Sequence, residues 1–204
     1  MKIKYFVRTI KTRDFDYSPL EYEELVDYNP DYIQSFIDQL RIISDYDAVL
    51  LEDDLKLCKD FQSEIEKAIE QYPDMIINFF ENYDLYYETH EQIPFAYNQC
   101  TYYPKGVAKI LADEMQKLKD KTPKKYSQYD HVEVDAMMNL NISHIAYRPC
   151  LVQHLGGNVS IIGNKGKRCT PYFIDYIKEL GIDYKDARKH LSELVILMKG
   201  DFSK

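Results

Sequence analysis

Three consecutive carboxylates, Glu52, Asp53 and Asp54, directly follow an apolar run in the segment DAVLLEDDLKLCKDF, residues 47–61. The run AVLL has the length and composition of a strand that is buried on both faces. In open α/β sheets, ligands bind beyond the carboxyl ends of the strands, where these acids are expected to lie. Adjacent carboxylates repel one another unless a cation or hydrogen-bond donors compensate. A divalent metal ion is the simplest compensation.

The oxygen ligands favour the hard ions Mg²⁺ and Mn²⁺ over zinc. Such ions usually share their coordination shell with the phosphates of a substrate, which suggests a diphosphate substrate. A purely structural alternative is that the acidic triplet begins the next helix, because Asp and Glu are favoured at helix N-termini.

The elements that must position these acids alternate along the chain. Apolar runs predict strands, and apolar positions at helical spacing predict helices. The expected strands are 3–7, 47–51, 75–80, 99–104 and 144–149. The expected helices are 32–43, 61–72, 107–118 and 133–141, with two more near the C-terminus; a loop precedes residue 30. This alternation predicts an α/β layered fold with a mostly parallel sheet.

Composition limits the classes of protein that the chain can be. Its 204 residues, 45% of them hydrophobic, are enough for one sizeable core, and we expect a single domain over 1–204. The net charge of -8 gives no general reason to expect nucleic-acid binding. The four cysteines lack a CxxC pairing, which favours reduced thiols, and no apolar run is long enough to span a bilayer. We therefore expect a soluble, cytoplasmic protein.

Three segments, in order, resemble one family of enzymes. YDAVLLEDDLKLCKDF looks like the EDD segment of GT-A glycosyltransferases, particularly the lipooligosaccharide and collagen β-galactosyltransferase family and the related branching N-acetylglucosaminyltransferases. NQCTYYPKGVAKIL, 98–111, is similar to the segment that follows their central strands, and YRPCLVQHLGGNVSIIGN, 147–164, resembles their C-terminal PSLVQHIG element. The resemblance implies a GT-A-like three-layer sandwich, with a core over about 1–165 and C-terminal helices over about 170–200.

The resemblance also implies a nucleotide-sugar donor, with UDP-sugars the first expectation, whose diphosphate is held on Mn²⁺ or Mg²⁺. Asp54 is the expected direct metal ligand, while Glu52 or Asp53 would contact the ribose or order the metal's waters. His154 is the candidate second ligand, because GT-A enzymes often bring a late histidine to the metal or the leaving diphosphate. A lone histidine can equally be a hydrogen-bonded structural residue.

Further donor contacts are expected in two loops. Gly156 and Gly157 would let the backbone approach a phosphate, and the basic side chains that follow could neutralise it. These basic residues are Lys165, Lys167 and Arg168. The same KGKR run is also typical of a solvated surface turn. At the other end of the chain, YFVRTIKTRDF resembles the strand and loop that hold the nucleotide base, with Arg8, Thr9 and Arg13 as candidate contacts.

The acceptor would be a glycan or another molecule with a reactive hydroxyl. Its activation needs a base, and Asp135 in YDHVEVDAMMN best matches the acid that the relatives carry before the PSLVQH element, with Glu133 next. The relatives invert the anomeric centre in one displacement, so we expect inversion. The alternative for Asp135 is a helix cap. The acidic balance disfavours a nucleic-acid acceptor.

Two other classes share these residues. A metal-dependent hydrolase or nuclease would use the same carboxylates to activate a water, although further clusters of acids and histidines are missing. A degenerate GT-A domain would bind a sugar or a partner without turnover.

Overall fold

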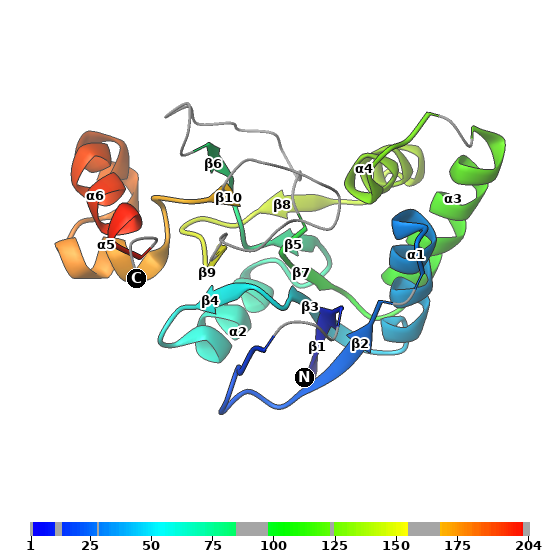
Figure 1. Cartoon of the computed structure of the whole chain (residues 1–204), viewed down its shortest axis with the longest axis horizontal. Helices are drawn as coiled ribbons and strands as arrows, with labels where there is room; N and C mark the ends of the chain where they lie inside the picture. The colour runs from blue at the N-terminus through cyan, green and yellow to red at the C-terminus, as the bar shows by residue number, and fades with distance from the viewer. Residues whose placement is uncertain are drawn as a thin grey trace.

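The computed structural model describes residues 2–10, 14–27, 29–84, 98–122, 125–154 and 168–201. Its centre is a six-stranded sheet with the order β2-β1-β3-β7-β5-β8 (Figure 1). The strands are β1 (Ile3–Thr9), β2 (Tyr22–Val26), β3 (Asp47–Glu52), β5 (Ile76–Asn78), β7 (Cys100–Tyr103) and β8 (His144–Ala146). β7 runs antiparallel to its neighbours β3 and β5, and the other pairs are parallel. The predicted α/β fold with a mostly parallel sheet is confirmed.

Helices cover both faces of this sheet. One face packs against α1 (Tyr32–Ile43), α3 (Val107–Lys121) and α4 (Tyr129–Leu140). The other face packs against α2 (Phe61–Gln71) and the C-terminal helices. Successive residues of β3 alternate between the two cores, with Ala48 and Leu50 on the α1 side and Val49 and Leu51 on the α2 side. Because both faces are covered, the middle of β3, residues 48–51, is apolar without a break.

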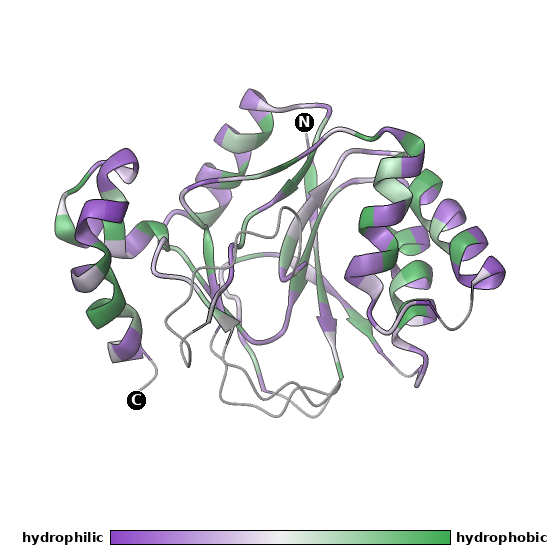
Figure 2. Ribbon diagram, turned by 90° about the horizontal axis from the view of Figure 1, so that it is seen from above, coloured by the Kyte–Doolittle hydropathy of each residue, from purple (hydrophilic) through white to green (hydrophobic). Residues whose placement is uncertain are grey.

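The helix ends follow local chemistry. The Asp31 carboxylate accepts a hydrogen bond from the Gln34 N–H and caps α1. Gly106, at φ +83, precedes α3, and Asn141, at φ 52, follows α4. Figure 2 shows hydrophobic and hydrophilic positions interleaved around the helices of the α1 face, as expected of amphipathic helices.

Two small ribbons and a helical end complete the chain. β4 (Leu55–Leu57) pairs antiparallel with β9 (Val152–His154), and β6 (Tyr83–Asp84) pairs with β10 (Arg168–Cys169). α5 (Ile174–Leu180), a 3₁₀ helix (Tyr184–His190) and α6 (Leu191–Asp201) follow. Figure 1 shows α5 and α6 together at one end of the molecule.

Several sequence expectations need correction. The loop expected before residue 30 contains β2, whose residues YEELV pair in parallel with β1. α4 begins at Tyr129 rather than near residue 133, so Asp135 lies within the helix and does not cap it. The acidic triplet leads into β4, and the next helix begins only at Phe61, so the triplet does not begin a helix.

Across the described residues, no helix combines the length and apolar character that a membrane span requires.

Candidate metal centre

The acidic turn, residues 52–55, joins β3 to β4. It lies at the point of the sheet where the connections from neighbouring strands lead to opposite sides. From β1 the chain continues to β2 on one side, whereas from β3 it continues through α2 to β5 on the other side. Arg8 near the end of β1 lies opposite Glu52 at the end of β3. In doubly wound sheets, the crevice beyond such a switch point is the usual ligand site. Topology therefore places the carboxylates at the expected ligand-binding edge.

Tyr17 holds the acidic turn from outside. Its hydroxyl donates to the Glu52 carbonyl oxygen at 2.6 Å and accepts from the Leu55 N–H at 3.0 Å. These backbone groups are the first and last of a four-residue turn, so the phenol oxygen joins the two groups that a closed turn would pair directly. The Tyr17 ring is buried and packs against Phe15 and Tyr22. The turn is therefore anchored to the aromatic side chains of the first loop.

The β4–β9 ribbon brings His154 to the same turn. Leu55, the first residue of β4, is the register partner of His154. Asp54 immediately precedes Leu55, so this pairing brings His154 close to Asp54. His154 Nε2 lies 3.4 Å from Asp54 Oδ2. One ligand atom from each of Glu52, Asp54 and His154 lies within 4.8 Å of the other two. Residues that are about a hundred positions apart in the sequence thus form one cluster.

Glu52 has partners besides the ligand cluster. Tyr129, the first residue of α4, donates its hydroxyl to Glu52 Oε1 at 3.1 Å, and Arg8 Nη1 lies 3.9 Å from the same oxygen. The Arg8 guanidinium lies 4.9 Å from the ring centre of Phe36 and 4.5 Å from that of Tyr129. Burial alone would lower the pKa of Arg8, but the nearby Tyr129 and Glu52 outweigh it and raise the pKa. The cation therefore stays charged beside the site.

Glu133 belongs to a buried network beyond Arg8. Its side chain is fully buried and accepts hydrogen bonds from the Tyr103 hydroxyl, at 2.7 Å, and from the Asn98 amide. Burial raises the pKa of Glu133 to about 8; the Tyr103 hydrogen bond opposes this shift, and Asp130 adds to it. The carboxyl group is therefore mainly protonated at neutral pH.

Asp135, the other candidate base, has different surroundings. Its Oδ2 accepts from Lys125 Nζ at 2.6 Å and from the Tyr126 hydroxyl at 2.7 Å, and the side chain is 36% exposed. These hydrogen bonds lower the pKa of Asp135, so the group is ionised at neutral pH. Asp135 is not part of the described Glu52, Asp54 and His154 cluster.

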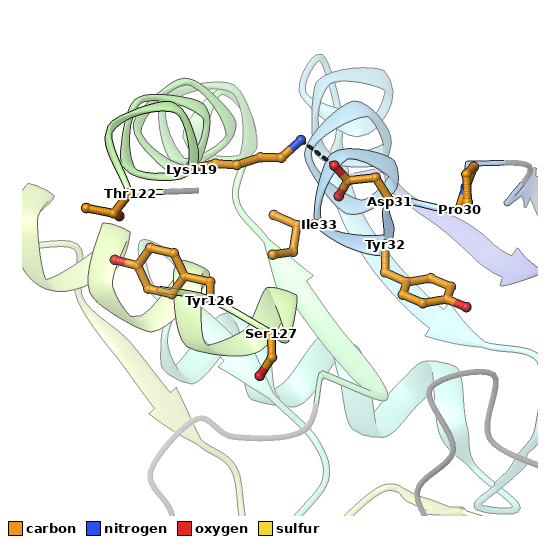
Figure 3. Close-up of a pocket in the computed structure, with 8 residues that line it drawn as sticks. All are labelled: Pro30, Asp31, Tyr32, Ile33, Lys119, Thr122, Tyr126 and Ser127. Carbon is orange, nitrogen blue, oxygen red and sulfur yellow. Dashed lines mark ion pairs between the residues drawn. The ribbon is translucent and has the colours of Figure 1, made fainter. Parts of the chain in front are cut away.

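A hollow of about 240 Å³ adjoins the Asp135 partner Tyr126 (Figure 3). It lies between the start of α1, the end of α3 and the chain before α4, and the 2.8 Å ion pair of Lys119 with Asp31 crosses one side. The lining residues are Pro30, Asp31, Tyr32, Ile33, Lys119, Thr122, Tyr126 and Ser127. None of these is a ligand-cluster residue, so the hollow is distinct from the metal centre.

The remaining predicted contacts divide into three groups. Asp53, in the acidic turn, and Thr9, at the end of β1, are both buried, with 6% and 3% exposure. Arg168 begins β10. Four predicted contacts and Gly157 lie outside the described residues; the four are Arg13, Gly156, Lys165 and Lys167.

The ligand cluster fits a divalent ion. It offers two carboxylates and one imidazole, which together suit Mn²⁺ better than Mg²⁺, because Mg²⁺ prefers an all-oxygen shell. The side chains of Glu52, Asp54 and His154 are 20%, 11% and 13% exposed, so an ion there would be shielded but reachable. Three protein ligands would leave coordination positions for a substrate or water.

The fold and the cluster define an α/β protein with a candidate divalent-metal centre at the carboxyl end of its sheet. No protein-family model matches the chain, and a search of curated proteins also finds no match. The glycosyltransferase resemblance therefore depends on the three short segments of this chain.

The sequence did not point to Tyr17 or Tyr129 as site residues. Both are among 19 tyrosines, many of them in charged, irregular context, and no spacing distinguishes the two. Their hydroxyls reach Glu52 across 35 and 77 positions of sequence. The available signal was modest: DYSP follows the first strand, and Tyr129 begins the acidic segment that contains the candidate bases.

Proposed function

We propose that the protein is a metal-dependent glycosyltransferase that moves a sugar from a nucleotide-diphosphate donor to a hydroxyl acceptor. The first donor class that we propose is the UDP-sugars. The observation that carries the proposal is the convergence of Glu52, Asp54 and His154 at the switch point of the sheet, with ligand atoms within 4.8 Å. The three segments that resemble GT-A enzymes include all three residues. Fold and motif thus support the same kind of site.

Each residue has a proposed role. Asp54 and His154 would hold the ion, and Glu52, kept in place by Tyr129, would be a third ligand or would order the ion's waters. When bound, a divalent ion supplies a Lewis acid that stabilises the charge on the departing nucleoside diphosphate. Arg8, charged and close to Glu52, would add positive charge on the donor side.

The proposed chemistry is one displacement with inversion. The acceptor oxygen forms a bond to the anomeric carbon while the bond from that carbon to the phosphate oxygen breaks, and the hydroxyl proton passes to a base. Asp135 is the candidate base whose lowered pKa keeps it ionised, whereas the raised pKa of Glu133 keeps it mainly protonated. Asp135 is our first choice because it also best matches the acid that the resembling enzymes carry, and Glu133 is our second.

Donor turnover tests the proposal directly. The unchanged chain is incubated with Mn²⁺ and a panel of nucleotide sugars, and release of nucleoside diphosphate is measured. We expect slow release from one donor, and its loss, by about 100-fold or more, in Asp54→Asn and His154→Ala. Asp38→Asn is the matched control, because Asp38 is a half-exposed acid on α1 paired with Arg41.

The other outcomes separate the alternatives. Nucleotide-sugar binding without release would indicate a degenerate domain, and breakdown of DNA or RNA would indicate a nuclease. Full activity in both site variants would remove Asp54 and His154 from the site and refute the proposal.

A further inference from the structure

The last described residue of α6, Asp201, makes two hydrogen bonds with distant parts of the chain. Its Oδ2 accepts from Lys56 Nζ at 2.7 Å and from the Tyr176 hydroxyl at 2.5 Å. Lys56 belongs to β4 and Tyr176 to α5. One carboxylate therefore ties both C-terminal helices to the first strand of the β4–β9 ribbon.

The second strand of that ribbon is held by Gln153. Its side chain is fully buried: Nε2 donates to the Thr170 carbonyl at 2.7 Å and to the Tyr176 hydroxyl at 3.3 Å. Its Oε1 accepts from the Thr170 N–H at 2.8 Å. Both ends of the amide are thus bonded, and breaking these bonds would leave buried polar groups unsatisfied. Lys56 is the register partner of Gln153, so the C-terminal segment contacts both strands at one level.

The register pair of Lys56 and Gln153 is adjacent to the pair of Leu55 and His154, and so to the ligand cluster. Side chains alternate between the faces of a strand, so Lys56 and Gln153 lie on one face while Leu55 and His154 lie on the other. Asp54 immediately precedes β4. Glu52, in contrast, belongs to β3 of the central sheet. A movement of the ribbon would therefore shift His154 and Asp54 relative to Glu52.

We propose that the C-terminal helices position the metal centre, with Asp201 and Tyr176 acting through Lys56 and Gln153 as positioning residues. The proposal deepens the proposed function and rests on its metal site. It assigns a role to α5 and α6, which Figure 1 shows at the end of the molecule beside β4 and β9. Their hydrogen bonds reach β4 and β9, so their effect is on the geometry of Asp54 and His154.

Metal affinity in the full-length chain tests this role. We compare Asp201→Asn, Tyr176→Phe and Lys56→Met by titration with Mn²⁺. Substitution of residues that hydrogen-bond to metal ligands typically weakens metal binding by about 10- to 100-fold. Asp201, Tyr176 and Lys56 act one step further from the ligands, so we expect Mn²⁺ to bind about three- to tenfold more weakly. Because Lys56 and Asp201 act through one ion pair, the Lys56→Met/Asp201→Asn double variant should lose little more than either single variant.

Lys178→Met is the matched control. Lys178 also ties α5 to the rest of the chain, but through Asp60 and Glu64, at 3.3 Å each, which lie outside the β4–β9 ribbon. Its Mn²⁺ affinity should stay within about twofold of the unchanged chain. Pulsed EPR provides a second readout. The ¹⁴N coupling of the His154 imidazole to bound Mn²⁺ should weaken in the three variants that loosen the ribbon, Asp201→Asn, Tyr176→Phe and Lys56→Met (the ribbon variants), and not in Lys178→Met.

The outcomes are distinguishable. Unchanged Mn²⁺ affinity and ¹⁴N coupling in all ribbon variants would overturn the positioning role and leave the metal centre standing. No Mn²⁺ binding by the unchanged chain, or unchanged binding by His154→Ala, would refute the metal centre and the positioning role with it. Lys56 is 38% exposed, so Lys56→Met should fold even if a more buried substitution does not.

Discussion

Substitution of Tyr17 by Phe removes one oxygen atom from the base of the acidic turn. The ring and its packing against Phe15 and Tyr22 remain, so the change isolates the hydrogen bonds to the Glu52 carbonyl and the Leu55 N–H. A neutral hydrogen bond contributes about 0.5–1.5 kcal/mol, so the free energy of unfolding should fall by about 1–3 kcal/mol.

The metal site should respond as well. Without the bridging hydroxyl, Asp53 and Asp54 would be less ordered before an ion binds, and fixing one backbone residue costs about 1–2 kcal/mol. Since about 1.4 kcal/mol corresponds to a tenfold change in affinity, we expect Mn²⁺ to bind about tenfold more weakly to Tyr17→Phe.

The assays are urea denaturation and Mn²⁺ titration of the same preparations. Tyr22→Phe is the control, because Tyr22 shares the aromatic contacts of Tyr17 but lies outside the acidic turn. A variant that loses stability and binds Mn²⁺ as tightly as the unchanged chain would refute the view that Tyr17 orders the ligands. If stability is also unchanged, the two hydrogen bonds themselves do not hold the turn.

Two further predictions concern the network beside the site. Tyr129→Phe removes a hydrogen-bond donor to the Glu52 carboxylate, so the free energy of unfolding, measured by urea denaturation, should fall by about 1 kcal/mol. Mn²⁺ should also bind more weakly to this variant. Tyr126→Phe, which removes a donor to Asp135, should leave Mn²⁺ affinity unchanged. Glu133 has a pKa raised from 4.5 to about 8, so the folded state binds a proton that the unfolded state has lost between these values. Its contribution to stability is complete below about pH 4.5 and declines by up to about 1.4 kcal/mol per pH unit as the pH rises toward 8. Glu133→Gln should therefore lose less stability than the unchanged chain between pH 5 and about pH 8 in denaturation series, and parallel profiles would contradict the raised pKa.

Much of the sheet could be predicted because its signals are local. The apolar run of β3 and the helical spacing in α1, α2 and α3 are readable within short windows, and all four elements are confirmed. β2 was missed because YEELV is an edge strand in which only Leu25 is buried, and a loop separates it from its pairing partner β1. Its strand character comes from that pairing rather than from its own composition.

The site divides in the same way. The carboxylates follow directly from the end of a buried strand, and His154 was selected through the resemblance of its segment. The meeting of Asp54 with His154 depends on the pairing of β4 with β9, which no local pattern specifies. Tyr17, Tyr129 and Asp201 each act through one hydroxyl or carboxylate group on partners that are distant in the sequence, so only the tertiary structure identifies them.

Anomalous diffraction from crystals grown with Mn²⁺ and a nucleoside diphosphate tests the central claim most directly. We expect a manganese peak at coordinating distance from Asp54 and His154, on the Glu52 side of the acidic turn, with the diphosphate bound to the same ion. A peak elsewhere in the molecule, or an empty turn at saturating Mn²⁺, would contradict the proposed metal centre.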